Sequence, residues 1–127
     1  MAVQIIRRYI YDIPILDLAG RFVAWTDPDG TSLRAPVTKL VSEGRVNVLV
    51  DLARVTDIDA HGLGELAWGA TTLRRSGGQM GLIAPSVWVH RLLALTRLDT
   101  VLAVYDSEFH AIPAFAGRLA PAARVAC

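Results

Sequence analysis

Short apolar runs alternate along this chain with segments whose apolar residues recur at helical spacing. Two β-branched runs, residues 5–10 and 13–18, are separated by two turn-forming residues, and this arrangement predicts a β-hairpin. The nearly continuous apolar run 46–50 is typical of a strand that is buried on both faces, and the polar residue Asp51 is expected to close it. The chain therefore contains a hairpin at one end and a buried strand near its middle.

The remaining part of the chain is predicted to contain four helices and two further strands. Apolar residues at intervals of three and four predict helices, and short apolar runs between them predict strands. The helices are expected at about 32–43, 60–75, 86–96 and 107–115, and the further strands at 80–83 and 101–105. Because strands alternate with helices, we expect an α/β domain with a mostly parallel or mixed sheet.

Length and composition are those of one small folded domain. The chain has 127 residues, of which 53% are hydrophobic and 20% charged, so it can bury a core and is not expected to be disordered. We place this domain at residues 1–116 and treat 117–127, rich in Ala, Arg and Pro, as a loosely held tail. The net charge is +1 and the basic residues are scattered, which argues against a nucleic-acid partner.

Two sequence features bear on the location of the protein. No apolar run approaches the ~20 residues that a membrane-spanning helix needs, and the N-terminus lacks the apolar core of a signal peptide. A cytoplasmic protein is therefore expected. Cys127 is the single cysteine, so neither an internal disulfide nor a cysteine cluster for a metal can form.

The densest polar cluster is the run Asp57-Ile58-Asp59-Ala60-His61-Gly62, at a predicted strand-to-helix junction. In α/β folds such junctions often carry functional sites. An enzyme would use Asp57 or Asp59 with His61 as an acid–base pair or as metal ligands, whereas the simpler interpretation is that Asp59 caps the helix and Asp57 is solvated. The chain lacks nucleophile, zinc and phosphate-loop motifs, so we expect no enzyme, cofactor or metal site. Gly62 and Gly64 are expected to permit close packing of the helix.

The helix that starts at this junction predicts a binding surface. Its core stripe runs through Leu63, Leu66, Ala67, Ala70 and Leu73. On the opposite side, the helical period places four residues together: His61, Glu65, Trp68 and Thr72. An exposed tryptophan among polar residues is a common anchor for a partner protein, and the alternative is that Trp68 lies under a loop or a terminal segment.

The run from Val48 to Gly64, VLVDLARVTDIDAHGLG, resembles the signature of STAS domains, which include the anti-sigma factor antagonists of bacteria. The family pattern is an apolar strand, then D-L, a short turn, and I-D-S-S-G-L-G opening a helix. Further agreement lies at residues 15–21, 77–82 and 89–98, so the resemblance covers roughly residues 5 to 112. It implies a four- or five-stranded sheet, mostly parallel, with helices packed largely on one side.

The resemblance also implies regulated binding of another protein. In the family, an anti-sigma factor that is also a serine kinase docks at the start of this helix and phosphorylates the second serine of the turn. Here the two serine positions are Ala60 and His61, so the phosphoacceptor position carries an imidazole. The partner-binding residues that we expect on this basis are Asp59, Ala60, His61, Gly62, Glu65, Trp68 and Thr72.

Three interpretations follow from the missing serine. The protein is an antagonist that always binds its anti-sigma factor or a related signalling protein, a structural STAS subunit of a larger sensory or lipid-transport assembly, or a paralogue that binds something else. In each of them the protein acts by binding and not by catalysis. The sequence is compatible with either a monomer or a homo-oligomer.

Overall fold

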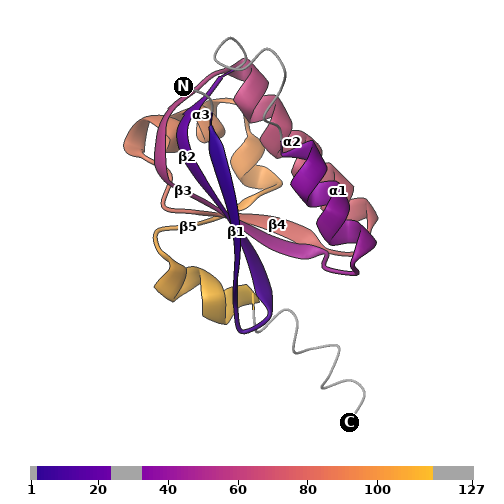
Figure 1. Cartoon of the computed structure of the whole chain (residues 1–127). Coiled ribbons are helices and arrows are strands. Elements are labelled where there is room, and N and C mark those ends of the chain that lie inside the picture. Colours follow the sequence, from indigo (N-terminus) through magenta and orange to yellow (C-terminus); the bar gives the residue numbers. More distant parts are fainter. Residues whose placement is uncertain (1–2, 24–32, 116–127) are drawn as a thin grey trace.

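A computed structural model describes residues 3–23 and 33–115 of the chain, and these form one mixed five-stranded sheet covered by helices (Figure 1). The strands are β1 Gln4–Ile10, β2 Ile13–Phe22, β3 Asn47–Ile58, β4 Gln79–Ile83 and β5 Ala103–Tyr105. The helices are α1 Arg34–Ser42, α2 Ala60–Arg75, α3 Val87–Leu95, the short 3-10 helix η2 Leu98–Thr100, and a further helix at residues 108–115. The predicted α/β class is confirmed.

The strands lie in the sheet in the order β1-β2-β3-β4-β5. β1 and β2 form the predicted antiparallel hairpin, and each later strand runs parallel to the strand before it. At the hairpin tip, Tyr11 and Asp12 have φ angles of 49° and 66°. Two left-handed residues in a two-residue connection match the twist of the strands that they join.

β3 is the central strand, and it is longer than the sequence predicts. It runs through Asp51, which we expected to close it, as far as Ile58. The extension forms because β2 is also long and pairs with β3 as far as Phe22 opposite Ile58, with two irregularities in register. The pairing of β3 with β4 ends at Asp51 opposite Ile83, so the last part of β3 pairs with β2 alone among the described strands.

Two hydrophobic clusters lie on opposite faces of the sheet. The larger one is formed by the sheet with α1, α2 and α3, and it contains Val48 and Val50, both 0% exposed as predicted for the central strand. The smaller one contains Ile15 and Leu49 from the sheet and Phe115 from the helix at 108–115. Figure 1 shows this yellow helix beside the hairpin, apart from α1 and α2. Most helices thus cover one face, as the family resemblance implies.

The helix limits agree with the signals in the sequence. α2 ends before Gly77, which has a φ of 91°, and the Gly78 N–H then donates to the Leu73 carbonyl at 2.8 Å. Ser86 caps α3 by accepting the Val89 N–H at 3.1 Å. The helix at 108–115 continues through Pro113. The predicted tail at 117–127 lies outside the described residues.

Within the described residues, every helix is too short or too polar to cross a membrane.

Candidate functional site

The start of α2 is fixed by a side-chain cap. The Asp59 carboxylate accepts the Gly62 N–H at 3.0 Å, which satisfies one of the free N–H groups of the first helical turn. Asp57 is the second-last residue of β3. Its Oδ2 lies 3.3 Å from Nη2 of Arg21 on the neighbouring strand β2. The two carboxylates therefore have structural contacts, one in the cap and one across the β2–β3 pair, while His61 is exposed to solvent.

Gly62 brings α2 close to the end of β2. A Cβ atom at this position would lie 2.3 Å from the backbone oxygen of Phe22 and 2.7 Å from Cγ1 of Ile58, so only glycine fits without movement of the backbone. Gly64, two residues later, has nothing within 4 Å of its Cβ position. The prediction that both glycines permit close packing is thus confirmed for Gly62 and wrong for Gly64, which faces open space.

The exposed side of α2 carries one imidazole among small residues. Its exposed residues at the N-terminal end are Ala60, His61 and Gly64, and Thr71 continues the same side two turns later. We call these four residues the His61 face. Trp68 and Thr72, which the sequence also places on this side, are half-buried.

Glu65 corrects the predicted surface, because it is only 4% exposed. Its Oε1 accepts the Leu33 N–H at 3.2 Å, and its Oε2 lies 3.1 Å from Nε of Arg34. Both partners belong to the start of α1, which packs beside α2. The carboxylate therefore holds the first turn of α1, where the favourable end of the helix dipole faces it. Glu65 is a structural residue between two helices and lies outside the His61 face.

Trp68 contributes to this same junction. Its ring packs against the main hydrophobic cluster, and the Arg34 guanidinium carbon lies 5.0 Å from the ring centroid. This distance is in the range of a cation–π contact. The two interpretations from the sequence, an exposed anchor and a residue covered by another segment, each describe part of what is found: α1 covers one side of Trp68 and the other side borders the His61 face.

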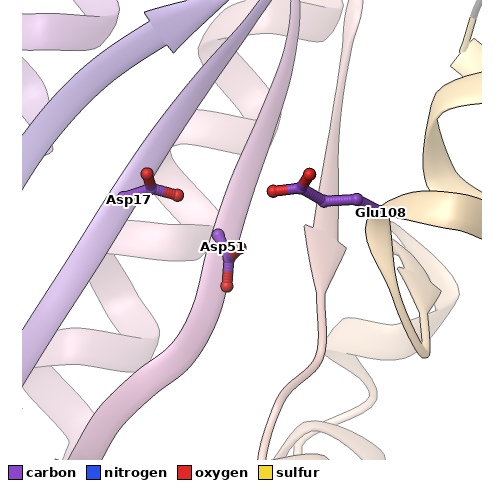
Figure 2. Close-up of side chains that lie close together, drawn as sticks. All are labelled: Asp17, Asp51 and Glu108. Atoms are coloured by element: carbon purple, nitrogen blue, oxygen red, sulfur yellow. The ribbon is translucent and has the colours of Figure 1, made fainter. Parts of the chain in front are cut away.

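A second polar cluster was not recognised in the sequence. Asp17 of β2, Asp51 of β3 and Glu108 of the helix at 108–115, called the last helix below, lie close together (Figure 2), with carboxylate oxygens within 4.8 Å of one another. Arg8 of β1 pairs with all three, at 2.5 Å from Nε to Asp17 and 3.4 Å from Nη2 to Asp51. The positive charge of the Arg8 guanidinium offsets part of the repulsion between the three carboxylates. Because Glu108 belongs to the last helix and the other residues to the sheet, these ion pairs connect that helix to the sheet.

Arg8, Asp17 and Asp51 form one wall of a cavity of about 310 Å³ on the sheet face away from α1 and α2. Ile6 and Arg54 also line this cavity. The four residues of the polar cluster share no sequence motif. The hairpin places Arg8 near Asp17, the β2–β3 register places Asp17 opposite Asp51, and the last helix adds Glu108.

Comparisons with known proteins agree with this architecture. The family model described as "Mlab, STAS domain" matches residues 14–104. A Thermotoga neapolitana protein, whose name describes it as a homologue of a proposed anti-sigma factor antagonist, is 29% identical over 80 residues, or 63% of this chain and 71% of that protein. A proposed anti-sigma factor antagonist from Thermotoga maritima is 30% identical over 69 residues, or 54% of this chain and 61% of that protein.

A solved structure shows the same fold. The anti-sigma factor antagonist SpoIIAA, a Bacillus cell fate determinant, superposes with a TM-score of 0.67 at 17% identity, covering 91% of this chain and 98% of that one. SpoIIAA has been determined in an unphosphorylated and in a phosphorylated form.

Proposed function

The chain belongs to the STAS domain family, and from this premise we propose that it is a regulatory protein-binding module of the anti-sigma factor antagonist type. It binds an anti-sigma factor or a related signalling protein in the cytoplasm, and it acts by binding and not by catalysis. The matching relatives carry names of that type. The contact lies on the His61 face of α2 and includes Asp59 and the exposed edges of Trp68 and Thr72. Gly62, which the sequence also places in the contact, is buried against β2 and supports this face from below.

The observation that carries this proposal is the exposure of the His61 face. Ala60 and Gly64 present little side-chain bulk, so the backbone of a partner can approach α2 closely beside the His61 imidazole. The face is also rigid, because the Asp59 cap and the close contact at Gly62 fix the first turn on the sheet. A preformed surface loses little conformational freedom on binding, which favours affinity.

The partner is identified by crosslinking from this face. A photoreactive amino acid placed at Ala60 is expected to capture an anti-sigma factor or another signalling protein in the native cells, and mass spectrometry of the adduct identifies it. The same residue placed at Ser42, exposed at the end of α1, is the control. Capture of a subunit of a transport or sensory complex would favour the structural STAS subunit instead. Equal capture from both positions would contradict a docking site on α2.

Gly64→Arg tests the face with the purified partner. The new side chain has space on the free protein, so the fold is retained, but it projects into the surface that the partner needs. We expect the dissociation constant to rise at least about tenfold, measured by calorimetry. Ser42→Arg adds the same charge away from this face and is expected to leave the affinity unchanged. Equal affinities for the two variants would place the contact elsewhere.

The absence of a hydroxyl at position 61 leads us to propose constant binding, without serine phosphorylation control. When the captured partner is a kinase, incubation with ATP is expected to leave the wild-type mass unchanged and to add one phosphate to His61→Ser. Phosphate would add about −1.5 to −2 charges at the start of the contact surface and weaken the complex. His61→Ala is the matched control. A phosphate on the wild-type protein within residues 56–62 would contradict the proposal.

A further inference from the structure

The outer side of α3 exposes an apolar surface that the His61 face does not include. Val87 is 77% exposed, Trp88 53% and Leu95 73%, while Val89 and Leu93 on the inner side are buried in the main cluster. At 100° per residue, positions 87, 91 and 95 fall on one side of the helix, with position 88 beside them. Three large apolar side chains thus lie on the outer side of a helix of nine residues.

Arg91 lies in the middle of this surface, one turn from Val87 and one turn from Leu95. It is exposed, and it makes no hydrogen bond or ion pair with any of the described residues. Arg8 pairs with three carboxylates and Arg34 with Glu65, whereas the side chains of Arg54, Arg75 and Arg97 resemble Arg91 in having no partner among the described residues. Arg91 differs from these three in lying between exposed apolar side chains of one helix. An unpaired guanidinium among apolar side chains is complementary to a carboxylate on an apolar partner surface, where the charge-assisted hydrogen bonds fix the register of the contact.

We propose that the outer side of α3, defined by Val87, Trp88, Arg91 and Leu95, binds an apolar segment of the signalling partner that carries an acidic residue opposite Arg91. This inference rests on the proposed function, because it assigns a second contact to the same partner. Tryptophan and arginine, with tyrosine, are enriched among the residues that dominate binding energy at protein interfaces. α3 itself contains no acidic residue, so the helix carries no charge of its own that would repel the partner's carboxylate.

Charge also separates a partner protein from two other occupants. In a two-fold symmetric contact between copies of this chain, the same surface would meet itself and bring two Arg91 side chains together. Helices that lie on anionic membranes are rich in lysine and arginine on their polar side, whereas α3 contains a single arginine and no lysine. The surface therefore fits a partner protein better than a second copy or a membrane.

The test uses the partner captured through Ala60. Arg91→Glu reverses the charge that pairs with the partner, and we expect the dissociation constant to rise at least about tenfold. Leu95→Ser removes apolar contact area from the same surface and is also expected to raise the dissociation constant. Arg54→Glu makes the matched charge reversal beside the cavity on the far face of the sheet and is expected to leave the affinity unchanged. Thermal unfolding measures whether the variants remain folded, which we expect because all three positions are exposed.

The outcomes separate this inference from the proposed function. Unchanged affinity for Arg91→Glu, with weakened affinity for Gly64→Arg, would overturn the α3 contact and leave the α2 contact standing. Binding of the free protein to vesicles of phosphatidylglycerol and phosphatidylethanolamine that is lost in Leu95→Ser would overturn it in favour of a membrane surface. Self-association in sedimentation equilibrium that is lost in Leu95→Ser would overturn it in favour of a second copy.

Discussion

Replacing Gly62 by valine is expected to lower the free energy of unfolding by about 3 kcal/mol. The added Cβ would lie 2.3 Å from the Phe22 carbonyl oxygen, and this atom belongs to the backbone of a paired strand and cannot rotate away. Relief of the clash would require α2 to move off the end of β2. Urea denaturation followed by circular dichroism measures the loss.

Gly64→Val is the matched control, because it introduces the same side chain into the same helix two residues later. Its Cβ position is open, and the helix propensities of glycine and valine differ little, so stability is expected to change by no more than about 0.5 kcal/mol. Similar losses for the two variants would show that helix propensity and not contact with β2 limits position 62.

Phe115→Ala is expected to cost about 3–5 kcal/mol, the usual range for loss of a buried aromatic side chain. Phe115 is 0% exposed and packs against Leu49 and Ile83 in the smaller cluster, with an edge-to-face contact to Tyr105. Its loss would leave a cavity between the last helix and the sheet. The same denaturation measurement gives the change in unfolding free energy.

Phe109→Ala tests the same helix at an exposed position. Phe109 is 83% exposed, so its truncation is expected to change the stability by less than about 0.5 kcal/mol. A loss for Phe115→Ala as small as that for Phe109→Ala would mean that the last helix contributes little to the fold, and that the smaller cluster is not part of the core.

The parts of the fold that depend on local pattern were predictable from the sequence. The hairpin, the buried run at 46–50 and the range of α2 follow from alternation, helical period, capping residues and glycine. The length of β3 did not follow, because Arg54, Thr56 and Asp57 are polar and lie on its exposed or half-exposed positions. These residues are in a strand because β2 pairs with them, and such pairing is a property of two segments together.

The candidate site was predictable in position but not in every residue. The capping role of Asp59 follows from its place before an apolar helical run, and the structure confirms it. Glu65 was placed outward because a helical period assumes a single buried side. α2 has two neighbours, the sheet below and α1 beside it, so a polar residue on its flank can be buried against Leu33 and Arg34. Nothing in the sequence of α2 alone contains this information.

The order of the strands in the sheet repeats their order in the chain. A polypeptide that leaves the ribosome from its N-terminus can therefore complete each pairing as the next strand emerges, and no later strand has to be inserted between two earlier ones. The smaller cluster is the exception, because Phe115 closes it from near the C-terminus. During synthesis, the hairpin and the α2 side of the sheet can thus assemble first, and the opposite face is covered only when the last helix is released.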